Sequence, residues 1–329
     1  GHRLGISESA TGSILAALGT ALPETLIPVI AIIQGGSAAN DVGVGAILGA
    51  PLLLATIAMF LVGMSAFVFS DRRDADERVL FPAESTRRDL SFFLFAYVLA
   101  VIAALVPSVV SIGIAAVLVA LYVFYVYRSV RTGDLAEGEG LDDLHLGRAV
   151  EATVGTDRDH ASNPHTVLVA AQTLIALGFI LLGARIFVTE IEFFSNEVFV
   201  VPAAIVALIL APLATELPET FNSVIWMADD NDTLALGNIT GAMAFQSTIP
   251  VTLGILFTSW NLSFQWGTTG FLNVFSAVLA LVSGGLVYLR ARAADTELRP
   301  GPFLIGGVFY VAFIALALYY VFVLGAGSA

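Results

Sequence analysis

The sequence has no cysteine, no lysine and few charged residues of any kind. Without cysteine, the chain can form neither a disulfide nor a thiolate metal site. Only 12% of the residues are charged, which is about half the share in a typical soluble domain. The four histidines are His2, His145, His160 and His165. All of them lie outside the long apolar runs, which excludes a histidine metal site inside a membrane.

Apolar residues dominate what is present: they make up 57% of the 329 residues, and the mean hydropathy is +0.89. A run of about 20 apolar residues can cross the hydrocarbon core of a bilayer as a helix. Nine runs predict an all-α polytopic membrane protein: 10–33, 43–69, 91–106, 108–127, 166–188, 198–228, 233–258, 268–289 and 302–324. A tight turn is expected at Pro107, between two of these runs.

All 14 basic residues are arginine, and their positions predict the orientation. Arginine occurs in the connections at 70–90, 128–165 and 290–301 and is absent from those at 34–42, 189–197 and 259–267. Because cytoplasmic connections of membrane proteins are rich in basic residues, we expect a multi-pass protein of the plasma membrane with the 128–165 linker in the cytoplasm and the C-terminus outside. The net charge of −13 without lysine favours a halophilic archaeal source, with a GC-rich genome as the alternative.

The chain contains an internal repeat. The segment LGTALPET at 18–25 matches LATELPET at 213–220 in six of eight positions. A second pair, GAILGA at 45–50 and GNITGA at 237–242, follows in the same order. Two matched blocks indicate a duplication, and the crossing count makes the copies inverted, as in many secondary transporters. This predicts a first half of four spans (1–127), an acidic cytoplasmic linker (128–165) and an inverted second half of five spans (166–329).

The two halves differ by one span. In the second half, the run at 166–188 precedes the motif run, whereas no such run precedes it in the first half. We therefore expect inverted five-helix repeats from which the first helix of repeat one is missing. A separate or lost N-terminal helix is then an expected partner, and a natural nine-span protein is the alternative.

Each copy of the repeat places a proline and a glutamate inside an apolar run. Pro23 and Pro218 each remove one helical hydrogen bond, so a kink or a break is expected there. The adjoining Glu24 and Glu219 are costly inside a bilayer, where an ionisable residue is a functional-site hypothesis by default. A protonated side chain that is hydrogen-bonded to a neighbour is the alternative without a function.

The surrounding residues suggest which ligand these glutamates take. Thr20 and Thr215 each lie four residues before a motif glutamate, on the same helix face. Hydroxyls, freed carbonyls and carboxylates are the ligands of Ca²⁺, Na⁺ or Mg²⁺ rather than of zinc or copper. Without a cation, two neighbouring buried carboxylates tend to hold a proton, so protons are a natural competitor. The second-block glycines predict close packing of the motif helices: Gly45, Gly49, Gly237 and Gly241.

These residues resemble the Na⁺/Ca²⁺ exchanger branch of the Ca²⁺/cation antiporter superfamily. The segments GTALPE and ATELPE are similar to that family's paired motif, Gly-Thr-Ser-Leu-Pro-Glu, and the glycine blocks are similar to its second block. The resemblance implies a ten-helix fold with both termini outside. It also implies that Glu24 and Glu219 are the central cation ligands, with Thr20 and Thr215 beside them.

The chain departs from the family pattern at several ligand positions. The motif serine is replaced by Ala21 in the first copy and by Glu216 in the second. Asn238 and Gln246 lie on one helix face of the second copy. The aligned first-copy face is apolar: Ala46, Ala50 and Leu54. The resemblance therefore implies the central divalent site more strongly than the family's Na⁺ sites.

Two further features keep more than one interpretation. Glu216 is either a third ligand or proton carrier, or a side chain that lies away from the site. Asn222 extends the ligand face of Glu219 or makes an ordinary contact between helices. The acidic run at 229–232 is interpreted as a solvated turn between helices, with attraction of cations to a vestibule as the alternative. The candidate metal ligands are thus Glu24, Glu219, Thr20, Thr215, Glu216, Gln246, Asn238 and Asn222.

Together these features predict a secondary antiporter that exchanges Ca²⁺ for Na⁺ by alternating access at a two-glutamate site in the middle of the membrane. A proton-coupled or Mg²⁺-type exchanger is the first alternative, and a non-transporting membrane subunit that keeps the fold is the second. We expect no enzymatic activity, no bound cofactor and no nucleic-acid partner. The expected partners are Ca²⁺, Na⁺ or H⁺ and the lipid bilayer.

Overall fold

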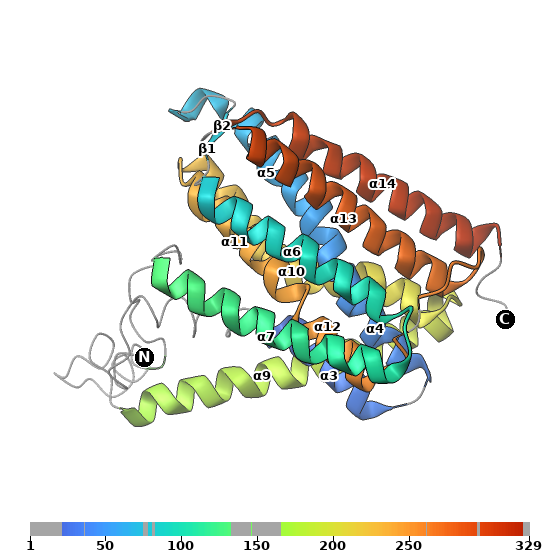
Figure 1. The fold of residues 1–329 in the computed structure, drawn as a ribbon. Coiled ribbons are helices and arrows are strands. Elements are labelled where there is room, and N and C mark those ends of the chain that lie inside the picture. Colours follow the sequence, from blue (N-terminus) through green and yellow to red (C-terminus); the bar gives the residue numbers. More distant parts are fainter. Residues whose placement is uncertain are drawn as a thin grey trace.

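The computed structural model describes residues 22–35, 37–74, 78–80, 83–132, 146, 166–260, 262–294 and 297–324. This part of the chain forms a bundle of long, slanted helices (Figure 1). The elements of the first half are α3 (Leu22–Gln34), α4 (Ser37–Leu53), a π-helical segment (Leu54–Ala58), α5 (Met59–Val68), a 3₁₀ turn (Ser70–Arg72), β1 (Val79–Leu80), α6 (Ala83–Ala103) and α7 (Ser108–Thr132). Those of the second half are α9 (Thr166–Phe193), a π-helical segment (Phe194–Phe199), α10 (Ala203–Ala228), α11 (Asp232–Gln246), α12 (Ile249–Phe257), α13 (Thr269–Ala293), β2 (Glu297–Leu298) and α14 (Gly301–Phe322).

Seven helices in the described residues are long and apolar enough to cross a membrane: Asn40–Val68, Ser108–Ser129, Thr166–Val198, Ala203–Ala228, Asp232–Phe257, Thr269–Ala293 and Gly301–Phe322. Each coincides with one of the nine expected runs. Of the other two runs, the first is described only as the short apolar helix α3, and the second lies in α6, whose first turns are charged. The multi-pass membrane character is thus confirmed, and the count of nine stays a prediction.

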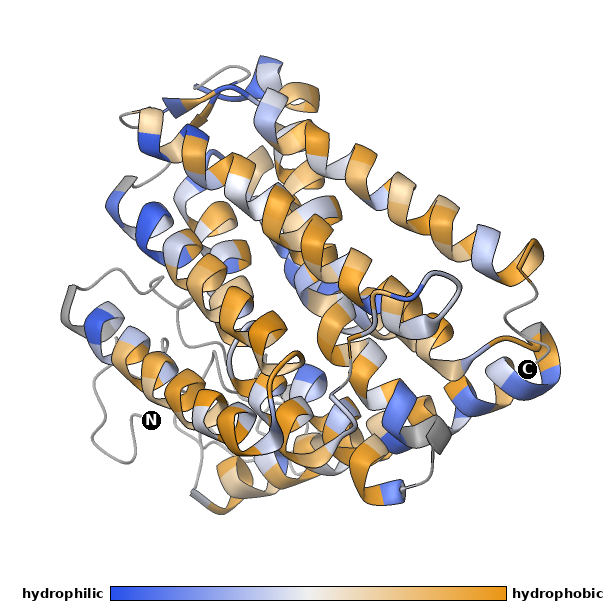
Figure 2. Ribbon diagram, turned by 45° about the vertical axis from the view of Figure 1, so that its right-hand side comes forward, coloured by the Kyte–Doolittle hydropathy of each residue, from blue (hydrophilic) through white to orange (hydrophobic). Residues whose placement is uncertain are grey.

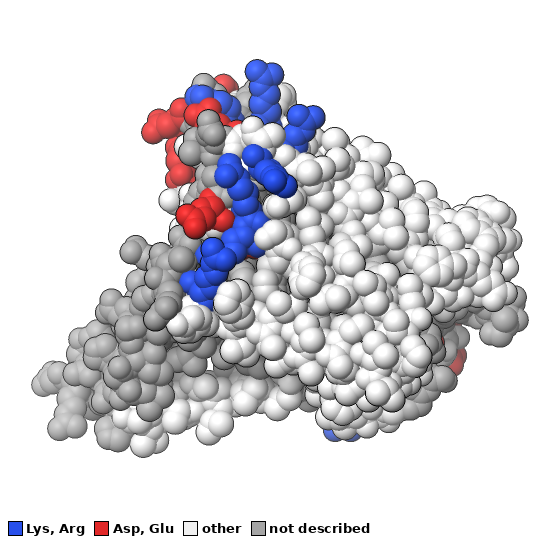
Figure 3. Space-filling view, viewed as in Figure 1, with Lys and Arg blue, Asp and Glu red and all other residues white. Residues whose placement is uncertain are grey.

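Apolar and polar residues occupy different parts of the bundle. The long helices are apolar around most of their circumference, and polar residues gather at their ends (Figure 2). On the face shown in Figure 3, arginine and acidic side chains cluster at one end, near β1, β2 and the start of α6, and the broad remainder is uncharged except for small groups of charged atoms at its lower and right edges. β1 and β2 pair antiparallel at this end, with Val79 opposite Leu298. We call it the Arg-rich end.

The second block of each half leads into a helix that is bent at the same place. Thr56 and Thr248 each follow the first glycine of their block by eleven residues. Both are fully buried, and each hydroxyl donates to the carbonyl four residues earlier, on Leu52 and Ala244 respectively. Such a bond competes with the helical ladder and bends a helix. The first-half helix forms its π segment there, and in the second half α11 ends and α12 begins.

Helices α4 and α10 make the largest contact between two helices in the described part of the chain. Glycine allows this closeness: a Cβ atom at Gly45 would lie 2.7 Å from the carbonyl oxygen of Ala204, and one at Gly49 would lie 2.4 Å from that of Leu208. Gly45 and Gly49 therefore pack closely, as expected. The expectation was wrong for the second pair within the described residues, because a Cβ at Gly237 meets no atom within 4 Å and one at Gly241 meets only the Tyr125 hydroxyl, at 3.9 Å.

Candidate cation site

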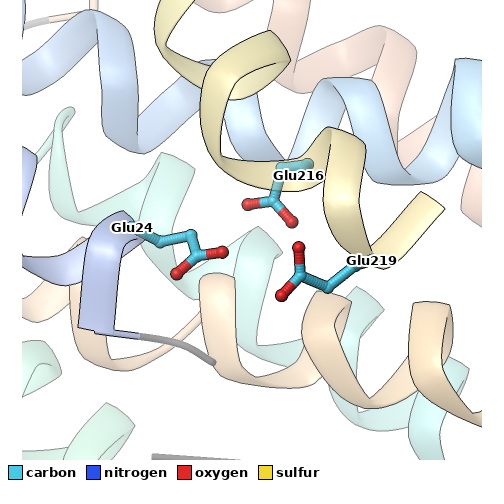
Figure 4. A group of neighbouring side chains, drawn as sticks. All are labelled: Glu24, Glu216 and Glu219. Carbon is cyan, nitrogen blue, oxygen red and sulfur yellow. The ribbon is translucent and has the colours of Figure 1, made fainter. Parts of the chain in front are cut away.

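Three glutamates from two helices meet inside the bundle. Glu24 lies in the first turn of α3, and Glu216 and Glu219 lie in the middle of α10. Figure 4 shows the carboxylate of Glu24 pointing across to the two from α10. The spacing of three residues puts Glu216 and Glu219 on one face of α10. Of the kink or break expected at Pro218, the break is not present, because α10 runs unbroken through Pro212 and Pro218.

The spacing of the three carboxylates fits a hard cation. One oxygen of each lies within 4.8 Å of the others. Calcium–oxygen distances are about 2.3–2.6 Å, so oxygens on opposite sides of one Ca²⁺ lie at most about 5 Å apart. One cation can therefore touch all three carboxylates. No other group of three or more acidic, histidine or cysteine residues within the described ranges has such a spacing.

Burial makes this cluster unstable without a positive charge. Glu24 is 7% exposed and Glu216 is fully buried, while Glu219 is half-buried. The Oε2 atoms of all three are buried without a hydrogen-bond partner in the described structure. Like charges this close, in a medium of low polarity, cannot all stay ionised unless a cation or protons neutralise them. The chemistry of the donors, all oxygen, suits Ca²⁺, Na⁺ or Mg²⁺.

Helix α11 supplies the polar wall beside the cluster. The Gln246 side chain is buried, and its Nε2 donates to Oε1 of Glu216 at 2.8 Å. Asn238 donates from Nδ2 to the backbone oxygen of Glu219 at 3.0 Å and to Oγ of Ser223 at 3.2 Å. Gln246 thus holds one carboxylate of the cluster, and Asn238 holds the backbone of another.

The remaining expected ligands lie at different distances from the cluster. Thr215 is buried on α10, and its hydroxyl donates to the carbonyl of Ala211 at 3.2 Å. Asn222 is exposed on α10, whereas the neighbouring Ser223 is buried and donates to the backbone oxygen of Glu219 at 3.0 Å. Thr20 lies outside the described residues. The structure therefore gathers Glu24, Glu216, Glu219 and Gln246 at one point and leaves Asn222 at the surface.

The first-half residues that align with this polar wall are apolar. Ala46, Ala50 and Leu54, which align with Asn238, Ala242 and Gln246, are all buried in the hydrophobic core. The oxygen donors of the described site thus come from α10 and α11, apart from Glu24. This asymmetry follows from the sequence differences between the two copies.

The interpretation of the acidic run at 229–232 was wrong for one residue. Asp232 is 3% exposed and forms a buried ion pair with Arg73, whose Nη2 lies 2.5 Å from Oδ2. Asp232 lies in an otherwise polar turn, so nothing in the local pattern signals its burial. Its partner, in the connection after α5, is distant in the sequence, and an arginine there reads as part of a solvated loop.

The comparison with known protein families shows to which family this chain belongs. The family model of the sodium/calcium exchanger protein matches residues 1–131 and 168–326, which is most of the chain. The chain belongs to the sodium/calcium exchanger family. Membership of this family makes it a membrane ion exchanger by descent, with its two matched regions on either side of the linker.

Solved structures share the fold of this exchanger family member at low identity. Native YfkE is 15% identical with a TM-score of 0.61, over 95% of this chain and 84% of YfkE. The sodium-calcium exchanger NCX_Mj, soaked with Na⁺ and Sr²⁺, is 19% identical with a TM-score of 0.57, over 95% and 88%. The H⁺/Ca²⁺ exchanger CAX is 17% identical with a TM-score of 0.58, over 95% and 83%.

Proposed function

We propose that this chain is a cation antiporter that exchanges Ca²⁺ for Na⁺ or H⁺ by alternating access at the cluster of Glu24, Glu216 and Glu219. The observation that carries the proposal is the meeting of three carboxylates, two buried and one half-buried, from both halves of the chain, within reach of one cation. The family supports cation antiport, and the cluster supports a divalent cation as one of the exchanged ions.

The inverted arrangement of the two halves belongs to this proposal. The bends at Thr56 and Thr248 fall at aligned positions, and so do the turns that precede the second blocks. In alternating access, two related halves present one site to each side of the membrane in turn. The charge of the empty cluster opposes its movement across the bilayer, so that only occupied or protonated states reorient. This links the inward movement of one ion to the outward movement of the other.

Coupling to protons is a second candidate with its own observation. The aligned first-half residues Ala46, Ala50 and Leu54 are apolar, so these positions provide none of the side-chain oxygen ligands that Na⁺ sites need. Glu216 adds a third carboxylate instead, and its Oε2 has no partner in the described structure. A carboxylate that a bound cation does not neutralise is a natural proton carrier.

Reconstitution into proteoliposomes tests the proposal. Uptake of Ca²⁺ is measured with an outward Na⁺ gradient and, separately, with an outward proton gradient and no Na⁺. Glu24→Gln and Glu219→Gln should abolish uptake under both gradients, while the matched control Glu190→Gln, an exposed glutamate of α9, should retain it. Normal exchange by either cluster variant would overturn the proposal, and the gradient that drives uptake decides between Na⁺ and H⁺.

Two features remain predictions beside this function: the plasma-membrane location with a cytoplasmic linker, and the halophilic archaeal source. Thiol labelling of single cysteines placed in the 290–301 connection of intact cells would test the orientation. Labelling by an impermeant reagent from outside would contradict it.

A further inference from the structure

Two hydrogen-bonded contacts tie the halves of the molecule to each other at opposite ends. At the Arg-rich end, Asp232 begins α11, and its Oδ2 accepts bonds from the backbone N–H of Leu80, at 2.8 Å, and from Arg73, at 2.5 Å. Leu80 and Arg73 belong to the connection that follows α5 in the first half. We call this contact the charged tie.

An aligned contact lies at the other end. Asn40 and Asp232 each precede the first glycine of their second block by five residues. Oδ1 of Asn40 accepts a bond from the backbone N–H of Ser259 at 2.8 Å. Ser259 follows α12 in the second half, so each half binds the connection that leaves the bent helix of the other. We call this contact the neutral tie.

The two ties differ in charge and in burial. The side chain of Arg73 is fully buried and that of Asp232 is 3% exposed, whereas the bond between Asn40 and Ser259 is exposed and joins neutral groups. Hydrogen bonds between ionised groups are roughly twice as strong as neutral ones. Removing one partner of a buried ion pair also leaves an uncompensated charge. The charged tie therefore resists opening more than the neutral tie does.

The backbone beside the charged tie adds a second restraint. Asp230 lies ten residues after Thr220, the last residue of LATELPET, and Gly35 lies ten residues after Thr25, the last residue of LGTALPET. Both have a positive φ, of 59° and 72° respectively. This conformation suits glycine and strains other residues. Asp230 adopts it while its carboxylate accepts the backbone N–H of Asp74 at 3.1 Å. The Arg-rich turn thus holds a strained residue in place by the same connection that provides Arg73.

Both ties secure the helix pairs that carry the cation cluster. The charged tie lies at the junction of α10 and α11, and the neutral tie lies at the start of α4, which follows α3. From these contacts we propose that the charged tie keeps the Arg-rich entrance shut more firmly than the neutral tie shuts the opposite one, so that the ion-free protein rests open at the opposite end. The proposal rests on the proposed function in taking the glutamate cluster as the site that both entrances reach.

Cysteine labelling of the purified protein tests this, because the 329-residue sequence has no cysteine of its own. Ser223→Cys reports the Arg-rich side, since Ser223 is buried four residues beyond Glu219. Ala46→Cys reports the opposite side, since Ala46 is buried and aligned with Asn238. The rate of labelling by a charged thiol reagent is measured for each in nanodiscs, without Ca²⁺ or Na⁺.

The perturbation is the double substitution Arg73→Gln with Asp232→Asn, which removes both charges together and leaves no lone buried charge. Labelling of Ser223→Cys should become about tenfold faster, as expected when a charge-assisted hydrogen bond is lost, while labelling of Ala46→Cys slows. Asn40→Ala should accelerate the labelling of Ala46→Cys and slow that of Ser223→Cys, and both changes should be smaller. Unchanged labelling at both reporters, or equal acceleration at both, would overturn the proposal.

A second variant covers the case in which the double substitution does not fold. Asp230→Gly removes the bond to Asp74 but relieves the positive φ, so the fold is retained. It should accelerate the labelling of Ser223→Cys alone, and an absence of that acceleration would contradict the proposal. Labelling requires no transport, so a failure here is distinct from a failure of Glu24→Gln to abolish exchange.

Discussion

Gln246 provides the sharpest test of how the cluster binds its cation. Its Nε2 donates to Oε1 of Glu216 at 2.8 Å, and both side chains are buried. The aligned residue of the first half is Leu54. The substitution Gln246→Leu therefore introduces the residue that the first half has at this position and keeps a similar side-chain volume. It removes one hydrogen bond to the carboxylate of Glu216.

The magnitude follows from that bond. A hydrogen bond to a charged group contributes about 1.5–3 kcal/mol, and the full amount is lost when the buried acceptor finds no other donor. Since about 1.4 kcal/mol corresponds to a tenfold change in affinity, Ca²⁺ should bind roughly 10- to 150-fold more weakly. Glu216 is ionised when it holds the cation, so the loss falls on the bound state.

Isothermal titration of Ca²⁺ into the purified protein measures this loss. The matched control is Thr252→Val in the neighbouring α12, because Thr252 is also buried but its hydroxyl has no hydrogen-bond partner among the described residues. That control should bind Ca²⁺ as the unmodified protein does. If Gln246→Leu also binds Ca²⁺ with unchanged affinity, Gln246 does not hold the carboxylate for the cation and the argument from the hydrogen bond is refuted.

Three further outcomes are expected. Gly49→Ala should lower the free energy of unfolding by about 1–3 kcal/mol in chemical denaturation, because its Cβ would lie 2.4 Å from the carbonyl oxygen of Leu208. The control Gly237→Ala should not lower it, because a Cβ there meets no atom within 4 Å in the described part of the chain. Asp230→Ala should be less stable than Asp230→Gly by about 1 kcal/mol, because alanine keeps the positive-φ strain; equal melting would contradict this. Glu216→Gln removes one charge from the moving site, so the voltage dependence of exchange in potential-clamped proteoliposomes should change by at most about 2.3 kcal/mol per 100 mV, and an unchanged voltage dependence would place Glu216 outside the transported charge.

The sequence predicts the multi-pass helical fold well because long apolar runs leave few alternatives in a bilayer. The repeat of LPET also predicts that Glu24 and Glu219 belong to one site, and the structure brings them together. Glu216 could not be placed in advance, since the side a residue faces depends on how α10 packs. The bond between Gln246 and Glu216 joins helices whose relative rotation no local pattern records.

The errors have a common cause. Asp232 has the sequence surroundings of a solvated turn residue, but it is paired with Arg73, which is 159 positions away in the sequence. Gly237 resembles Gly45 in sequence but has a different surrounding. In each case tertiary contacts decide the outcome, and these are the contacts that a single sequence does not encode locally.

The glycine contact between α4 and α10 has a mechanical consequence. Where Gly45 and Gly49 bring one helix onto the carbonyl groups of the other, no side chain lies between them that could change rotamer and absorb a displacement. The two helices, one from each half, then move together as one rigid unit. Movement is easier for α7 and α9, which pack least against the rest of the bundle: only 17% and 6% of their most apolar segments are buried. The rigid pair of α4 and α10 therefore fixes the position of Glu216 and Glu219, while α7 and α9 can move.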